Sequence, residues 1–434
     1  MERLLGRQAV QDLDLEALEM AVRQRVLSLA GSFLQRWLNR DTCDYAGPHR
    51  ACACGGEARY AGRRAKRFRS VLGELELERA YYHCPRCGQG FCPRDRQLGL
   101  ENTSVSPAIT RMIASVAALV SFQEGSDLLK ELTGVSVDAK HVERTAEALG
   151  AEIAADERHH TESSENVALP KTLYLGMDGT GIPMRREELA GRAGKQPDGS
   201  AKTREVKLCT VWSAETRDAN GIPVRDQGSV TYSAAIESAA TADPTQRAAF
   251  TERVLRETTR RCFCQAERRV VLGDGAPWIW HIAHELFPGA IQIVDRFHAK
   301  QHLSDLGKAI YGPTDLRAAQ WAKRRHAELD DGRFDALLQA ISRQIPTCPE
   351  ARPCLQYFKT NRRRMRYPDF HEQGWCTSTG VVEAGCKLAI GTRLKRSGMH
   401  WTVKGSNAII ALRCCRLSGR FQDFWERRSD DRAA

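Results

Sequence analysis

Apolar side chains recur every three or four positions over residues 13–39, near the start of the chain. This spacing predicts one amphipathic helix, because positions three and four apart share a helix face. We interpret the face as a surface for packing or self-association rather than as a site of chemistry. The apolar positions are Leu13, Leu15, Leu18, Val22, Val26, Leu29, Phe33 and Trp37.

The helical pattern returns between Pro107 and Glu152. A helix over residues 122–134, the pair Val135–Ser136 and a second helix resemble a helix-turn-helix, with Ser136 as the predicted N-cap of the second helix. Many structural helix hairpins have the same pattern, so DNA recognition by this segment is one of two interpretations. On the DNA interpretation, three side chains of the second helix face a groove: Lys140, His141 and Arg144.

Beyond a polar linker at residues 158–166, apolar runs of strand length alternate with helical periodicity. The predicted order is three strands, helix, strand, helix, strand, which is the order of a ribonuclease-H-like mixed-sheet core. Residues 299–372 are mostly helical in pattern and resemble an insertion. The predicted strands are residues 172–177, 205–212, 229–235, 269–273 and 290–294, and the helices between them are residues 244–260 and 277–287.

The length of the chain indicates how many domains it has, and its charge indicates the kind of partner it binds. A chain of 434 residues has room for about three domains. Its 65 Lys and Arg against 54 Asp and Glu give a net charge of +11, which favours a polyanionic partner such as nucleic acid. The excess lies mainly in residues 351–434, which hold 17 Lys and Arg against seven Asp and Glu. The sequence shows no membrane-length apolar run and no signal segment at its start, so we expect a reducing cytoplasm.

Six of the 15 cysteines lie between Cys43 and Cys92. In a reducing compartment such a cluster predicts metal ligands rather than disulfides, with unligated thiols as the alternative. Cys84-x-x-Cys87 has the spacing of a zinc knuckle, and its partner Cys52-x-Cys54 is one residue short of that spacing. We therefore predict structural Zn²⁺ on these four cysteines. Further candidate ligands are Cys43, Cys92, His49 and His83.

Two aspartates, Asp178 and Asp274, each end a predicted strand and each precede a glycine. Carboxylates at neighbouring strand ends can share divalent cations, and two Mg²⁺ ions about 3.5–4 Å apart serve phosphodiester chemistry. Such a site needs a third carboxylate, for which Glu383 at the start of a predicted helix is the best candidate. The alternative is that the Asp-Gly pairs are ordinary turns and that Glu383 is solvated. Spacing alone leaves other acids open: Glu328, Glu350 and Glu372.

These residues stand in segments that resemble the bacterial insertion-sequence transposases of the Kra type, within the Mutator-like group of DDE transposases. The resemblance spans nearly the whole chain and is most specific in the block from Gly380 to Trp401. It implies a helical insertion in the core and an Asp, Asp, Glu triad at Asp178, Asp274 and Glu383. The other matching segments are Cys84–Gly88, Gly176–Thr180, Gly273–Trp278 and Val294–His298.

The resemblance also implies how the site is completed. Two catalytic Mg²⁺ ions, which Mn²⁺ can replace, would be held by the triad. An Asp-x-x-His element, Asp295 to His298, would position DNA or the scissile phosphate beside the metals. A histidine that only caps the following helix is the alternative.

Charge and aromatic residues predict the DNA contacts. Basic side chains neutralise phosphates and make binding sensitive to salt, and tryptophans can stack on an exposed base. A solvated arginine or a core tryptophan is the alternative at each single position. The predicted contacts are Arg362, Arg363, Arg364, Arg393, Lys395, Arg396, Trp278 and Trp401, with Trp280 as a further stacking candidate.

The predicted organisation is multidomain α/β with all-α parts. Its segments are an N-terminal amphipathic helix (residues 1–42), a zinc-ribbon-like module (43–100), a helical, helix-turn-helix-like DNA-binding region (101–160), the first part of a ribonuclease-H-like core (168–298), a helical insertion (299–375) and the C-terminal part of the core with the basic segment (376–434).

The sequence therefore predicts a DDE transposase that binds the terminal inverted repeats of its insertion sequence, cleaves DNA with two metal ions and joins the 3′-OH ends to target DNA. Since two DNA ends must meet, we expect a homodimer or larger homo-oligomer, in the bacterial cytoplasm and associated with the nucleoid. Two alternatives remain: a nuclease or resolvase of the same fold without strand transfer, and a catalytically inactive DNA-binding regulator derived from a transposase.

Overall fold

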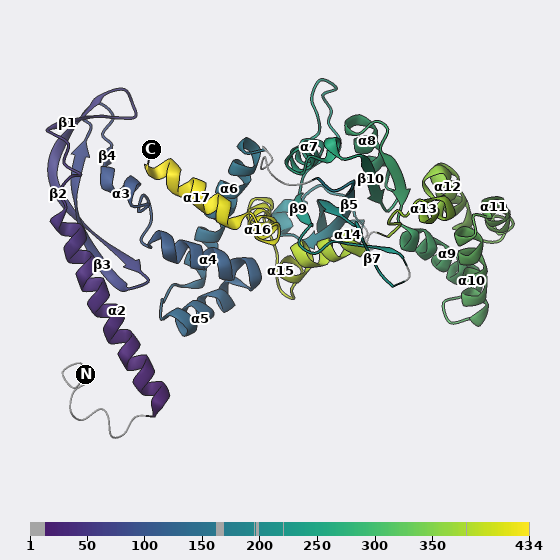
Figure 1. The fold of residues 1–434 in the computed structure, drawn as a ribbon, viewed down its shortest axis with the longest axis horizontal. Helices are drawn as coiled ribbons and strands as arrows, with labels where there is room; N and C mark the ends of the chain where they lie inside the picture. The colour runs from purple at the N-terminus through teal and green to yellow at the C-terminus, as the bar shows by residue number, and fades with distance from the viewer. Residues whose placement is uncertain are drawn as a thin grey trace. The chain divides into compact units, whose positions relative to one another are not determined.

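The chain folds into two compact units, shown in Figure 1. One unit is Met1–Leu149 with Gln422–Ala434, and the other is Gly150–Phe421. Residues 422–434 thus group with the N-terminal unit, which corrects the prediction that all of residues 376–434 belong to the catalytic core. The computed structural model describes residues 14–161, 169–194, 196, 199–219, 221–378 and 380–433; Leu13, the linker residues 162–166 and Thr379 lie outside these ranges.

A four-stranded antiparallel sheet organises the N-terminal unit, in the order β1-β2-β3-β4. Alternate residues of β3 point inward, and Leu75 and Leu77 form a small core with Phe68 and Leu100. The turn between β2 and β3 is tight and requires a positive φ of +112° at Gly73, which glycine adopts without strain. The strands are β1 (His49–Ala51), β2 (Glu57–Ser70), β3 (Gly73–His83) and β4 (Gly90–Phe91).

Helix α2 (Leu15–Arg40) covers this core and the open edge of β3. The Asp14 side chain caps it by accepting a hydrogen bond from the backbone N–H of Ala17 at 2.9 Å. Gln35 and Asn39 accept hydrogen bonds from backbone N–H groups of β3 at 2.8 and 2.9 Å. These side chains satisfy donors that an uncovered strand edge would leave free. The helix predicted over residues 13–39 is therefore present over its described part.

The N-terminal unit also contains the predicted helical hairpin. A capping box between Ser121 and Glu124 starts α5, and Gly134 with φ of +74° ends it. Asp138, not Ser136, caps the next helix by accepting the N–H of His141 at 2.9 Å. The prediction of Ser136 was wrong because the turn is longer than expected. The helices are α3 (Pro93–Gln97), α4 (Pro107–Leu119), α5 (Phe122–Thr133), α6 (Ala139–His159, which continues into the second unit) and α17 (Phe421–Ala433).

A five-stranded mixed sheet forms the core of the second unit, in the order β11-β10-β5-β6-β9. Strands β5, β6 and β9 pair antiparallel, whereas β10 and β11 run parallel to β5. Two helices, α7 (Ala249–Arg260) and α8 (Pro277–Leu286), precede β10 and β11. The strands are β5 (Thr172–Pro183), β6 (Thr203–Ser213), β9 (Thr231–Ala235), β10 (Arg268–Gly273) and β11 (Ile291–Val294), and a small hairpin is made by β7 (Thr216–Arg217) and β8 (Pro223–Val224).

Two predicted boundaries in this unit are wrong, the end of β5 and the start of α7. Strand β5 does not end before Asp178 but continues to Pro183, because the first half of β6 pairs with residues 179–183. Asp178 therefore lies inside a strand. Helix α7 starts at Ala249, five residues after the predicted start at Pro244.

The chain after β11 is helical, as predicted for residues 299–375. Five helices come first: α9 (Arg296–Tyr311), α10 (Leu316–Asp330), α11 (Phe334–Ser342), α12 (Ala351–Asn361) and α13 (Tyr367–Glu372). A second helical run follows, made by α14 (Gly380–Gly385), a π-helical stretch (Cys386–Gly391), α15 (Thr392–Leu394) and α16 (Val403–Leu417). None of the described helices combines the length and apolarity that a membrane crossing requires.

A buried ion-pair network joins α7 to the end of α16. Glu257 is fully buried and accepts hydrogen bonds from Thr231, Arg420 and Arg260 at 2.6, 2.5 and 3.1 Å. Burial raises the pKa of Glu257, but the positive charges of Arg420 and Arg260 outweigh it and hold the pKa below its ordinary value. The carboxylate is therefore ionised in the folded protein at neutral pH.

Replacing Glu257 with Gln is expected to lower the free energy of unfolding by about 3 kcal/mol, because two half-buried arginines, Arg260 and Arg420, lose their buried counter-charge. A carboxylate with a lowered folded-state pKa stabilises the fold above its unfolded-state pKa, and this effect is lost as the pH falls through the folded-state pKa. Urea unfolding of Glu257→Gln and the parent chain at about pH 7 and about pH 3 should show a difference that shrinks in acid. A difference independent of pH would contradict the ion-pair explanation.

Candidate metal sites and nucleic-acid interface

Asp178 and Asp274 lie side by side on neighbouring parallel strands. In the register of β5 and β10, Leu272 is opposite Gly176, so two residues later Asp274 follows β10 at the level of Asp178. Both side chains are half-buried. Burial raises the pKa of Asp178, and the negative charge of Asp274 raises it further. Two like charges this close are unfavourable unless a cation neutralises them.

Local hydrogen bonds orient the carboxylates of Asp178 and Asp274. Asp178 accepts the backbone N–H of Gly179 at 2.6 Å and the thiol of Cys386 at 3.4 Å. Asp274 accepts the backbone N–H of Ala276 at 2.9 Å. Gly275, between Asp274 and Ala276, has φ of +104°, and a Cβ there would lie 2.5 Å from the ring of Tyr357. The turn after β10 therefore requires glycine, both for its conformation and for the close packing.

Helix α14 lies directly on the sheet and carries Glu383. A Cβ on Gly176 would lie 2.1 Å from Val382, and a Cβ on Gly385 would lie 2.9 Å from Tyr232. The helix thus rests on β5 and β9 through glycines at both contacts. Glu383 is one helical turn before Cys386, which donates to Asp178.

Glu383 is held by a lysine in this conformation. Its carboxylate is paired with Lys387 at 2.8 Å, and this hydrogen bond lowers the pKa of Glu383. Within the described part of the chain, the only group of three or more candidate ligand atoms within 4.8 Å of one another is a set of four cysteines. The three carboxylates are thus gathered at one region of the sheet without forming a closed ligand set. Exposed ion pairs contribute only about 0–1 kcal/mol, so a metal can recruit Glu383 at small cost.

Asp295 and His298 stand at the start of α9, beside Asp274. The backbone N–H of Asp295 donates to Gly273 at 2.8 Å, and its carboxylate accepts the backbone N–H of His298 at 2.6 Å. Asp295 is only 1% exposed, so it is a helix cap that positions His298. The same hydrogen bond places His298 in the first turn of α9, directly after β11.

Two of the alternative acids are engaged elsewhere. Glu328 pairs with Arg325 at 2.6 Å within α10, and Glu350 accepts the thiol of Cys348 at 3.2 Å beside α12. Glu372 ends α13. None of the three stands on an element that packs over Asp178.

The basic block after Glu383 divides into buried and exposed residues. Arg393 is fully buried with its guanidinium 5.3 Å from the ring centre of Trp401, which is itself only 6% exposed. Neither side chain is accessible to DNA, which corrects their predicted role: they anchor the segment. Lys395 is exposed and donates to Thr180, two residues after Asp178. Arg396 is half-buried.

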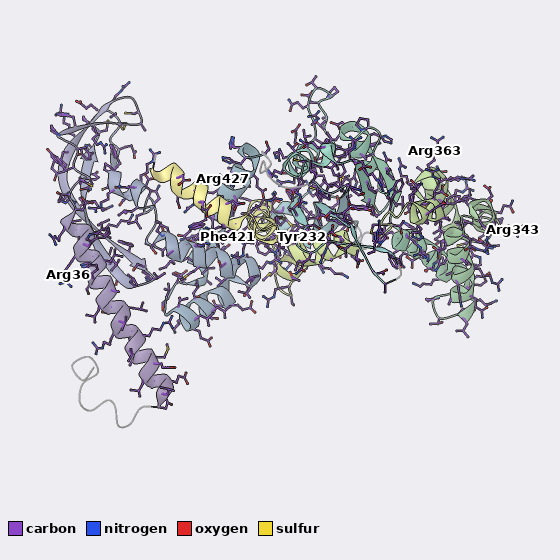
Figure 2. The ribbon with its side chains drawn as sticks, viewed as in Figure 1. Arg36, Tyr232, Arg343, Arg363, Phe421 and Arg427 are labelled. Carbon is purple, nitrogen blue, oxygen red and sulfur yellow. The ribbon has the colours of Figure 1, made fainter. Side chains whose placement is uncertain are left out.

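The other predicted DNA contacts differ in how far they are engaged. Arg362 pairs with Asp335 at 3.0 Å, and Arg364 stacks on the buried Trp280 and donates to Gln292 at 2.7 Å. Arg363, labelled in Figure 2, is exposed at the surface of the helical segment. Of the three arginines, Arg363 is the one most open to a phosphate.

Lys207 lies beside Trp278 and is a residue that the sequence did not single out. Trp278 is half-buried at the start of α8, and Lys207 lies 5.5 Å from its ring centre. Lys207 stands opposite Gly179 in the sheet, so its side chain leaves the face opposite to that of Asp178, and it pairs with Glu205. A lysine in a strand carries no sequence signal for this contact, because only the fold brings Trp278 and Lys207 together.

The helical hairpin of the N-terminal unit keeps its polar residues at the surface. Lys140 and Arg144 are exposed, although Lys140 pairs with Glu143 at 2.7 Å. His141 is half-buried. DNA recognition by these residues stays a prediction.

Four cysteines of the N-terminal sheet converge to a metal-binding geometry. The Sγ atoms of Cys52, Cys54, Cys84 and Cys87 all lie within 4.8 Å of one another, and two of the pairs are 3.7 Å apart. Zn–S bonds of about 2.3 Å in a tetrahedron give S–S separations of about 3.8 Å. The donor set and its size therefore fit Zn²⁺, and the other candidate ligands are not needed.

Two similar turns present these sulfurs. Gly55 donates to the carbonyl of Cys52 and Gly88 to that of Cys84, each at 2.9 Å and each with a positive φ. The backbone N–H of Cys87 lowers the pKa of Cys84 to about 7. An N–H of Gln89 lowers the pKa of Cys87, but the neighbouring sulfur of Cys54, burial and the other thiols together raise it to about 12. Without a cation the four sulfurs cannot all ionise, which is the behaviour of a metal site.

Replacing Gly176 with Ala is expected to destabilise the second unit by about 2 kcal/mol, because the new methyl group overlaps Val382 and pushes α14 off the sheet. Thermal unfolding should show a lower midpoint. Gly380→Ala is a matched control, since a Cβ there has its nearest neighbour, the Ser378 hydroxyl, at 3.5 Å. Equal midpoints for both variants would contradict the close contact between α14 and β5.

Comparisons with known proteins give little guidance. No family model and no curated protein matches the chain. Among solved structures, the chain is similar to the Drosophila P element transposase strand transfer complex, with 11% sequence identity, 77% of this chain and 83% of that chain covered, and a TM-score of 0.27. A score this low does not establish a shared fold.

Proposed function

We propose that this chain is a DDE transposase whose catalytic carboxylates are Asp178, Asp274 and Glu383. One observation carries the proposal: Asp178 on β5 and Asp274 at the end of the adjacent parallel strand β10 stand at the same level, and the helix on β5 bears a glutamate. Paired carboxylates with a third in reach are the oxygen ligands that hard divalent cations take. The positive net charge of the chain agrees with a DNA substrate.

The sheet supports a ribonuclease-H-like core. Three antiparallel strands come first in the chain, followed by two parallel strands reached through helices, in the spatial order β9-β6-β5-β10-β11. The helices α9 to α13 intervene before α14 returns to the sheet. This is the arrangement expected of such a core with a helical insertion.

The carboxylates would hold Mg²⁺, or Mn²⁺ in its place, and two bound ions would activate the attacking oxygen and stabilise the leaving oxygen of the phosphodiester. Asp178 and Asp274 are aimed by the backbone N–H groups of Gly179 and Ala276. Glu383 leaves its ion pair with Lys387 to join them. His298 hydrogen-bonds a phosphate oxygen, and Asp295 holds the histidine in place through the start of α9.

DNA would be bound by both units. Lys395, which is exposed near the carboxylates, and Arg363 on the helical segment neutralise phosphates. The zinc module and the helix carrying Lys140 and Arg144 would recognise the terminal inverted repeats. Because two ends are processed together, the active form would be a homodimer or larger homo-oligomer.

The test uses purified full-length protein, Mg²⁺ and DNA that carries the sequence flanking its own gene. We expect strand breaks at the element's ends, and joining of pre-cut 3′-OH ends to a target plasmid. Cleavage without joining would replace the transposase by a nuclease or resolvase. Binding without cleavage would favour the inactive regulator.

A further inference from the structure

One face of α2 carries large apolar side chains that no described residue covers. Six of them are between 37% and 72% exposed: Leu15, Val22, Val26, Leu29, Phe33 and Trp37. The opposite face is already packed, since Gly31 is buried against the carbonyl of Leu72 and Leu34 lies on the core of the sheet. The stripe is therefore not needed to hold α2 on its own unit. Contiguous exposed apolar side chains of this size indicate an interaction surface.

The stripe has the seven-residue repeat of a coiled-coil seam. Val22 and Leu29 form one row, and Val26 and Phe33 form a second row four positions along. The rows continue outward into charged residues of opposite sign. The first row is Leu15, Val22, Leu29 and Arg36, and the second row is Glu19, Val26, Phe33 and Arg40. The two rows span more than three heptads, and their apolar positions lie within residues 15–33.

The charges decide how a second helix can lie on this seam. In a parallel pair, each seam residue meets its own counterpart, so Glu19 would face Glu19, and Arg36 would face Arg36. In an antiparallel pair each row faces the other row, and a two-fold axis beside Leu27 and Ser28 sets Glu19 opposite Arg36 of the second copy. Like charges oppose pairing and opposite charges favour it.

The same antiparallel register matches four of the five apolar seam residues, and the fifth, Leu15, meets Arg40 of the second copy. Val22 meets Phe33 of the second copy, and Val26 meets Leu29 of the second copy. Every contact is repeated by the two-fold axis, as in a closed symmetric dimer. A helix of 26 residues is about 39 Å long, so the whole seam can be buried along its length.

We infer that α2 is a dimerisation helix, on which the α2 of a second copy of this chain lies antiparallel, closed at each end by a Glu19–Arg36 ion pair. Arg36 is labelled on α2 in Figure 2. Both charged residues are exposed. The inference concerns assembly and does not rest on the chemistry proposed for the second unit.

The test measures the mass of the full-length chain in solution by light scattering during size-exclusion chromatography. The parent chain of 48.5 kDa should have the mass of a dimer. Phe33→Glu should give a monomer with unchanged helicity, because Phe33 makes its contacts across the seam. Ser28→Glu is the matched control, since Ser28 is exposed on α2 outside both rows and the dimer should persist.

A charge exchange tests the orientation. Glu19→Arg and Arg36→Glu should each raise the dissociation constant of the dimer by roughly 10-fold or more, through like charges at both ends. The double variant should restore the parent value, because each arginine then meets a glutamate again. In a parallel pair neither single variant would weaken the dimer, because each would only replace one pair of like charges with another. A monomeric parent chain, a dimeric Phe33→Glu variant or an unrestored double variant each overturns the inference.

Discussion

Replacing Asp178 or Asp274 with Asn is expected to lower DNA strand cleavage at least about 1,000-fold, because each variant loses a negative ligand from a site that works through metal ions. Glu383→Gln should have an effect of the same order. Cleavage of end-labelled DNA in Mg²⁺ measures the loss. Affinity for DNA should stay near the parent value or rise, since removing negative charge near the substrate does not weaken binding to phosphates.

Controls separate loss of chemistry from loss of fold. Asp315 caps α10 by accepting the N–H of Arg317 at 2.7 Å, and asparagine caps helices as well as aspartate does. Asp315→Asn should therefore cleave DNA like the parent chain. If Asp178→Asn cleaved at the parent rate with an unchanged thermal midpoint, the assignment of the triad would be wrong.

The sheet could be predicted because its centre leaves a clear pattern in the sequence. Residues 172–177 of β5 are all buried, so they appear as a continuous apolar run. The extension of β5 to Pro183 could not be predicted in the same way. Residues 179–183 are stabilised by pairing with the first half of β6, and such pairing is a long-range property that periodicity does not record.

The predicted DNA contact at Arg393 was wrong, because its charge was taken as a sign that the side chain is exposed. Arg393 is charged, yet it is fully buried between Trp401 and the sulfur of Met399. An arginine in a basic run is solvated in most proteins, and only the tertiary fold shows the aromatic ring beneath this one. Lys395, two residues away, has the exposure that the sequence suggested for both.

The position of Glu383 was predicted only in part. The sequence placed it at the start of a helix, and α14 does begin at Gly380. That this helix lies on β5 depends on Gly176 and Gly385, whose missing side chains let it approach. The sequence does not indicate that a glycine in a strand and a glycine in a distant helix lie in the same helix–sheet contact.

Replacing Cys84 with Ser is expected to abolish zinc binding and unfold the sheet of β1 to β4. Structural zinc in small modules contributes about 10 kcal/mol or more, which exceeds what a core as small as that of Ala58, Ala80 and Tyr82 can replace. Elemental analysis should fall from one zinc per chain to none, and limited proteolysis should cut residues 43–100.

Because α2 packs on β3, and β3 leads directly into Cys84, the loss should also reach assembly and DNA binding, while the second unit keeps its thermal transition. Cys43→Ser is the matched control, since Cys43 is exposed in the same segment and lies outside the four-sulfur cluster. It should retain zinc and resist proteolysis like the parent chain. Equal zinc content and stability in Cys84→Ser would mean that the four thiols are unligated, and the sheet would then depend on its apolar core alone.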